Sequence, residues 1–108
     1  MSGFLQVVTT VDDEDHAMKI ARQLVECRLA ACVQVEGPIQ SLYWWQGKVE
    51  NATEWRCSIK TAEERYDELE QKLRALHPYE EPEILAFPVD RGSAGYLSWL
   101  SSIVRPTS

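Results

Sequence analysis

Long apolar runs, paired cysteines and clustered basic residues are all missing from this 108-residue chain. No stretch approaches the roughly 20 apolar residues that cross a bilayer, so we expect no membrane partner. Lysine and arginine number 11 against 17 aspartates and glutamates, which gives a net charge of −6. Because binding to a phosphate backbone depends on a basic patch, we expect no nucleic-acid partner. Residues 1–5 lack the basic segment and the cleavage site of a secretory signal, which favours a cytoplasmic protein.

Cysteine and histidine are too scarce for the common metal and catalytic motifs. The three cysteines, Cys27, Cys32 and Cys57, form no C-x-x-C pair, which argues against a disulfide framework or a zinc ribbon. The only histidines are His16 and His77. No G-x-S-x-G, glycine-rich phosphate loop or H-E-x-x-H occurs. We therefore expect a protein that is not an enzyme.

The apolar pattern predicts four strands and three helices. Strands are expected at 5–11, 30–45, 48–61 and 83–89, where β-branched and aromatic residues gather. Helices are expected after the acidic run 12–15, over 63–76 and over 96–103, because apolar residues recur there at helical spacing. The first helix should bury Ala17, Ile20, Ala21, Leu24 and Val25.

This order of elements indicates an α+β fold of the ferredoxin-like (βαββαβ) type, with an extra C-terminal helix. Two helices should lie on one face of a four-stranded antiparallel sheet. The length fits a single domain over residues 1–108.

The hairpin formed by the second and third strands is too long for its own domain. Each strand spans roughly 13 residues, or about 40 Å, whereas a compact domain of this length is only about 34 Å across. Near its tip stand Tyr43, Trp44 and Trp45, and neighbouring strand residues point to opposite faces. One helix layer cannot cover both indoles, which favours self-association. The alternative is a hairpin that bends at 37–38 and folds its tryptophans onto the chain's own last helix.

The densest polar segment, residues 77–83, is a candidate metal site. His77 could bind a divalent metal together with Glu80 or Glu81. Zinc sites normally use three or four protein ligands, so neighbouring subunits would supply the others. The alternatives are a proline-punctuated connection that ends the helix at His77, or a site for another ligand. The acidic run 12–15 is interpreted as a helix cap rather than a cation site.

Several motifs occur in register over nearly the whole chain: Ala-Ala-Cys-Val at 30–33, Ser-Leu-Tyr-Trp-Trp-Gln-Gly-Lys at 41–48, Glu54, Lys60-Thr61, His-Pro-Tyr-Glu-Glu-Pro-Glu-Ile at 77–84 and Tyr-Leu-Ser-Trp-Leu at 96–100. Together they resemble the CutA divalent-cation tolerance family. The resemblance implies a tight homotrimer whose long hairpins pair with neighbouring sheets, and a link to divalent metals, copper especially, without a catalysed reaction. The architecture is similar to the trimeric PII signalling proteins, which implies metal or small-molecule sites between subunits.

Six residues are candidates for a ligand cleft or for the trimer interface: Tyr43, Trp45, Glu54, Lys60, Tyr79 and Trp99. Lys60, Glu54, Tyr79 and also Arg91 could converge on a cleft between subunits, or they could form salt bridges between subunits. Some bacterial members of the family carry a cysteine at the end of the first strand and paired histidines before Pro-Tyr. Here Thr9 and Leu76 stand at those positions, so the soft thiolate ligand that suits copper is missing.

Two other functions share this order of elements. A small phosphate-ester or acylphosphate hydrolase would need a loop after the first strand that cradles phosphate with backbone N–H groups and an arginine. Residues 9–14 form an acidic loop instead, which repels phosphate. An RNA-binding domain would need aromatic rings on the central strands and a basic surface, whereas Arg56, Ser58 and Lys60 occupy the outward positions.

Overall fold

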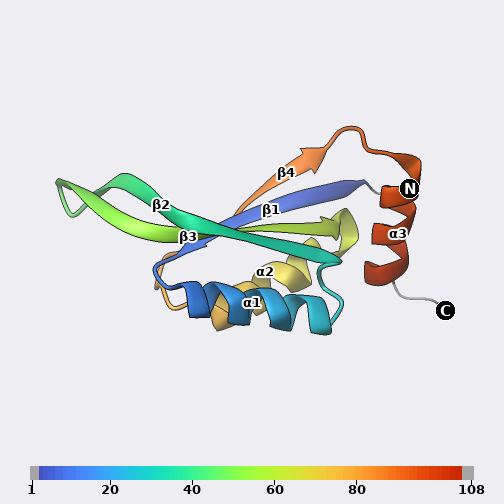
Figure 1. Ribbon diagram of the computed structural model, residues 1–108, viewed down its shortest axis with the longest axis horizontal. Coiled ribbons are helices and arrows are strands. Elements are labelled where there is room, and N and C mark those ends of the chain that lie inside the picture. Colours follow the sequence, from blue (N-terminus) through green and yellow to red (C-terminus); the bar gives the residue numbers. More distant parts are fainter. Residues whose placement is uncertain (1–2, 106–108) are drawn as a thin grey trace.

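The chain forms one four-stranded antiparallel sheet, with strand order β2-β3-β1-β4, and two helices packed against one of its faces (Figure 1). The computed structural model describes residues 3–105. Its strands are β1 (Phe4–Val11), β2 (Cys32–Trp45), β3 (Lys48–Ala62) and β4 (Leu85–Val89). The α+β, ferredoxin-like prediction is confirmed, and the second and fourth strands begin two residues later than expected.

Helix α1 spans Glu14–Glu26, a short 3-10 turn η1 (Glu63–Arg65) leads into α2 (Tyr66–Leu76), and α3 spans Ala94–Val104. The carboxylate of Asp13 accepts hydrogen bonds from the backbone N–H groups of Asp15 and His16. The acidic run therefore caps α1 as predicted, because the first N–H groups of a helix have no partner inside it.

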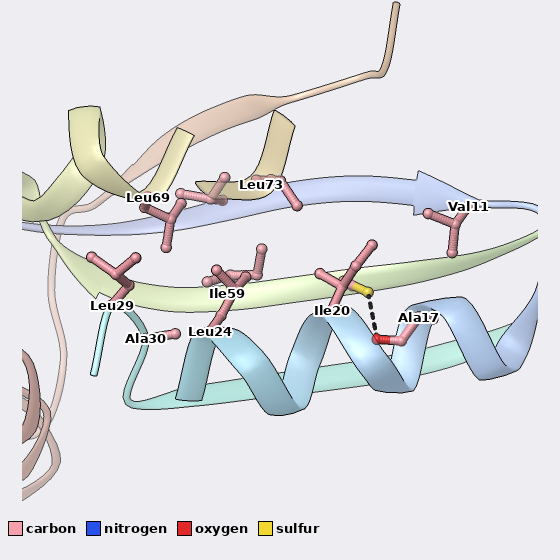
Figure 2. Close-up of a cluster of buried hydrophobic side chains, with 11 residues drawn as sticks. Val11, Ala17, Ile20, Leu24, Leu29, Ala30, Ile59, Leu69 and Leu73 are labelled. Carbon is pink, nitrogen blue, oxygen red and sulfur yellow. Dashed lines mark hydrogen bonds between the residues drawn. The ribbon is translucent and has the colours of Figure 1, made fainter. Parts of the chain in front are cut away.

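The main core lies between the sheet and the helices α1 and α2 (Figure 2). Its largest fully buried side chains are Val7, Val11, Ile20, Leu24, Ile59, Leu69 and Leu73. Cys57 lies within it, with Sγ 3.8 Å from the carbonyl oxygen of Ala17, and burial raises the pKa of its thiol to about 11. The prediction for Val25 was wrong, since its side chain is exposed at the last turn of α1.

A second core lies on the opposite face of the sheet, at one end. There α3 packs Leu100 and Val104 against Phe4, Ala31 and Ala62. Residues directly paired across neighbouring strands share a face, and Phe4 pairs with Ala62. The rest of this face has no helix layer over it, and we call it the open face. Its residues include Gln6, Val8, Thr10, Gln34, Glu54, Arg56, Ser58, Lys60, Leu85 and Phe87.

The outer part of the β2–β3 hairpin, residues 39–54, projects from the molecule, and we call it the arm (Figure 1). The longest dimension of the chain is 49 Å, against 25 and 22 Å for the others. Gln46 and Gly47 turn at its tip with φ of 49° and 79°, which are typical of the tight turns of hairpins. At its base, Glu36 pairs with Arg56 and Ile39 with Glu54, so β2 carries one extra residue there, a β-bulge.

The arm leaves its large apolar side chains in solvent. Four of them are more than half exposed: Leu42 (69%), Trp44 (75%), Trp45 (56%) and Val49 (57%). The arm and α3 lie at opposite ends of the molecule (Figure 1). The alternative in which the hairpin folds its tryptophans onto the last helix is therefore wrong, and the predicted overshoot is confirmed.

Candidate functional site

The segment after α2 is held to the end of β1 by His77. Nε2 of this buried ring lies 3.0 Å from Oγ1 of Thr9 and 3.0 Å from the carbonyl oxygen of Thr10. The backbone N–H of Tyr79 donates to Nδ1 at 3.1 Å. Because Nδ1 accepts a hydrogen bond, the neutral ring carries its proton on Nε2 and donates it to β1. Burial lowers the pKa of His77, although the bond to Thr10 and the charge of Glu54 act in the other direction.

This geometry leaves no ring nitrogen of His77 free for a metal. Glu80 and Glu81 are exposed, on the connection that follows the ring. Within residues 3–105, no three His, Cys, Asp or Glu side chains are arranged to hold a metal ion. A single chain therefore does not fit a resident metal, and the ligand set of His77, Glu80 and Glu81 stays a prediction that depends on a second subunit.

Tyr79 connects the same segment to the base of the arm. Its hydroxyl donates to Oε2 of Glu54 at 2.7 Å, and its ring centroid lies 4.9 Å from that of His77. Burial, followed by the hydrogen bond to Glu54, raises the pKa of the Tyr79 phenol. Glu54 is only 7% exposed, and within residues 3–105 no lysine or arginine forms an ion pair with it. A buried carboxylate whose negative charge is unpaired can accept a cation.

The predicted cleft is split between the two ends of the open face. Lys60 donates to Oε1 of Gln34 at 2.9 Å. It shares a face with Glu54 but lies six positions along β3, which is about 20 Å. Arg91 follows β4 at the end where Val89 pairs with Phe4, so it too lies far from Tyr79. One chain thus brings Glu54 and Tyr79 together and leaves Lys60 and Arg91 apart from them.

The aromatic candidates are exposed at both ends of the molecule. Tyr43 and Trp45 lie on the same side of the arm as Glu54, because the register beyond the bulge pairs Tyr43 with Glu50. Trp99 is partly exposed on α3, and its ring centroid is 5.5 Å from that of Tyr96. Leu85 and Phe87 of β4 are also exposed, so the open face carries apolar surface between the two aromatic groups.

Sequence reasoning did not identify Thr9 as the partner of His77. Thr9 is fully buried, on the face of β1 that also carries Val7 and Val11. A polar residue within an inward-facing apolar series signals a buried hydrogen bond, so the alternation could have revealed it. The exposure of Leu42 and Val49 was missed as well, since apolar strand residues are usually covered.

The loop after β1 does not resemble a phosphate cradle. The carboxylate of Asp13 already accepts from the first free N–H groups of α1, the groups that would otherwise bind an anion. This geometry gives the hydrolase alternative no support. Within residues 3–105, no helix has the length and apolar character needed to cross a bilayer.

Comparisons with known proteins agree over nearly the whole chain. A family model described as CutA1 divalent ion tolerance protein matches residues 5–103. The divalent-cation tolerance protein CutA of Thermus thermophilus is 44% identical over 87% of this chain and 91% of its own length. The crystal structure of CutA1 from Oryza sativa has a TM-score of 0.94 at 35% identity, over 98% of this chain and 97% of that one.

A further similar structure bears on location. It is described as the periplasmic divalent cation tolerance protein CutA from Archaeoglobus fulgidus, with a TM-score of 0.91 at 37% identity, over 94% of this chain and 99% of that one. The cytoplasmic location expected for the present chain therefore stays a prediction.

Proposed function

This chain belongs to the CutA1 divalent ion tolerance protein family, and from that membership we propose that it acts in the response to divalent cations, copper in particular. In this proposal it is a homotrimeric binding and signalling protein without a catalysed reaction. Its ligands, metal ions or small molecules, bind between subunits, as the resemblance to the trimeric PII signalling proteins implies.

The exposed arm is the observation that carries the proposal. Exposed apolar patches on a monomer usually mark an interaction surface, and the arm has large apolar side chains on both of its faces, Trp44 on one and Trp45 on the other. The open face adds Phe87 and Leu85. A second copy of the chain would cover both regions if the arm of one subunit lay along the sheet of the next.

A contact of this kind uses two different surfaces and therefore forms a ring or an open fibre. In a ring of three, which the resemblance implies, each arm would lie on the open face of the next subunit, so no arm or open face would stay uncovered. β2 and β4 are the edge strands of the sheet, and an edge strand offers unpaired backbone N–H and C=O groups to a neighbour. The pairing of hairpins with neighbouring sheets is thus a feasible form for the assembly.

Such a ring also completes the divided cleft. The Glu54–Tyr79 pair lies at the arm end of the open face, whereas Lys60 lies toward the α3 end. Head-to-tail packing would place the arm end of one subunit near the α3 end of the next. A cleft between subunits would then contain a carboxylate, a phenol and an ammonium group, which suits either a small charged ligand or a salt bridge.

The link to copper is proposed as weak binding between subunits. Copper favours thiolate and imidazole ligands, and each chain offers one buried imidazole whose nitrogens are both hydrogen-bonded. A metal at His77 would have to replace the bond to Thr9 and Thr10 and recruit Glu80 or Glu81, or ligands from a neighbour.

The assembly is tested by measuring mass in solution at micromolar concentration. We expect the wild type and the control Met18→Ala, which removes an exposed apolar side chain from α1, to have three times the mass of one chain. Trp45→Ala should shift the population toward smaller species. A monomeric wild type would overturn the proposal.

The metal link is tested by titrating copper and zinc into the wild type and His77→Ala, with His16→Ala as the matched histidine control. We expect binding to weaken in His77→Ala alone. Equal binding by all three proteins would end the assignment at His77 and leave the assembly proposal intact.

A further inference from the structure

A shallow groove of about 520 Å³ lies between helices α1 and α2. Its lining comes from four residues of α1, from Cys27 that caps the helix, and from one residue of α2, namely Lys19, Arg22, Gln23, Glu26, Cys27 and Lys72. The residues from Lys19 to Cys27 stand at i, i+3, i+4, i+7 and i+8, which places them on one side of the helix. We call this hollow the helix groove.

The charge of the helix groove is opposite to that of the chain. Three cationic side chains and one carboxylate line it, in a protein with a net charge of −6. Lys19 and Lys72 form no ion pair with any of residues 3–105. Arg22 and Glu26 are 3.7 Å apart and both are largely exposed, and exposed pairs of this kind hold their partners weakly. The cations are therefore available to a ligand.

The end of α1 does not oppose an anion in the groove. Unsatisfied carbonyls at a helix C-terminus carry partial negative charge, but here they are capped. Arg28 adopts a left-handed conformation with φ of 62°, and the N–H groups of Arg28 and Leu29 donate to the carbonyls of Val25 and Leu24. This is the Schellman arrangement, which turns the last carbonyls toward the chain's own N–H groups.

The helix groove lies away from the surfaces that the proposed assembly uses. It belongs to the helix layer, whereas the open face is on the other side of the sheet and the arm projects from its end (Figure 1). A ligand could reach the groove whether or not the chains are assembled.

We propose that the helix groove binds a phosphate-bearing small molecule through Lys19, Arg22 and Lys72. Ammonium and guanidinium groups form charge-assisted hydrogen bonds with phosphate oxygens, and the amide of Gln23 adds a neutral donor. The site is independent of the metal and assembly functions proposed above.

The test is a titration of the ¹⁵N-labelled protein followed by amide chemical shifts, with pyrophosphate in one arm and magnesium-free ATP in the other. We expect saturable shifts at Lys19, Gln23, Cys27 and Lys72. Tighter binding of ATP than of pyrophosphate would identify a nucleotide as the ligand. Equal binding of the two would show that the groove recognises only the phosphate groups.

The variant Lys19→Gln/Lys72→Gln should bind about tenfold more weakly, because two charge-assisted contacts are lost. Lys48→Gln is the matched control, since Lys48 is at the tip of the arm, and it should bind as the wild type does. The proposal is overturned if the groove amides do not shift, if the double variant binds as tightly as the wild type, or if sulfate at equal ionic strength gives the same shifts.

Cys27 gives a second measurement, because it is the exposed cysteine that lines the groove, whereas Cys32 is only partly exposed and Cys57 is buried. Pyrophosphate should slow the alkylation of Cys27 by neutral iodoacetamide in the wild type and leave the double variant unaffected. Equal protection of both proteins would contradict the assignment.

Discussion

Thr9 and His77 are 68 positions apart in the sequence, yet Oγ1 of Thr9 lies 3.0 Å from Nε2 of His77. By the family resemblance, these are positions at which some bacterial members carry a cysteine and a histidine. In this chain a hydroxyl stands where a thiolate would be. The two side chains therefore form a hydrogen bond that ties the end of α2 to β1, and they lack the soft ligand that copper favours.

A thiol at position 9 should strengthen copper binding. We expect Thr9→Cys to bind copper at least about tenfold more tightly than the wild type, because a thiolate and an imidazole would then face each other. The measurement is a competition titration against a coloured copper chelator. Thr10→Cys is the matched control, since the side chain of Thr10 points to the open face, and a similar gain there would show that any added thiol suffices.

Stability should fall in mild acid because of His77. Burial lowers the pKa of this ring below its usual 6.5. Between the two pKa values, the unfolded chain therefore binds a proton at His77 that the native chain does not bind. The contribution is fully present above about pH 7 and is lost as pH falls through 6.5 toward the native pKa. Urea unfolding between about pH 8 and pH 5 should show this decline in the free energy of unfolding.

The His77→Gln variant should have lower stability at neutral pH but a flatter dependence on pH. His16→Gln is the comparison variant: the nearby charge of His16 contributes a smaller part of the lowering of the His77 pKa than burial does, so the slope should flatten only slightly. An unchanged slope in His77→Gln would mean that another group governs the decline.

The bond between Tyr79 and Glu54 should stabilise the base of the arm. Removing the hydroxyl in Tyr79→Phe leaves a buried carboxylate without its donor, which costs about 1–3 kcal/mol of unfolding free energy. Chemical denaturation of Tyr79→Phe, Glu54→Gln and the double variant measures the coupling. Strictly additive losses would show that the 2.7 Å contact contributes nothing of its own.

Gly37 should not tolerate a side chain. A methyl group at this position would overlap the indole of Trp55, and overpacking of this kind costs about 1–3 kcal/mol. Thermal unfolding of Gly37→Ala should show the loss. Gly95→Ala is the contrasting variant, because nothing lies near a methyl there and replacing an unstrained glycine by alanine stabilises by about 0.4–1 kcal/mol through the unfolded chain. Equal effects would mean that the contact with Trp55 is not tight.

The sequence predicted the element order and most of the core because both depend on local periodicity. Leu69 and Leu73 recur at helical spacing, and Cys57 and Ile59 alternate along a strand, so each residue's inward position is determined by its neighbours. The prediction for Val25 was wrong because this residue lies at the edge of the buried stripe of α1, next to Leu24, which is fully buried.

The sequence identified several residues of the site but not the contacts between them. Tyr79 and Glu54 were both named from the sequence, but their contact joins residues 25 positions apart, which no local pattern encodes. The bulge in β2 between Glu36 and Ile39 has an effect on the strand's faces that was not predicted. It shifts the alternation of β2 by one residue, so Val33 and Val35 face the helices whereas Tyr43 and Trp45, also odd-numbered, share the side of Glu54.

The projecting arm also affects the protease sensitivity of a chain that has not assembled with other subunits. Two strands with no layer on either side protect their tip poorly, and Lys48 stands exposed there next to the turn. An orphan chain would offer this peptide bond to a trypsin-like protease, whereas a neighbouring subunit would shield it. In the proposed assembly, the arm that joins the subunits would therefore also expose unassembled chains to proteolysis.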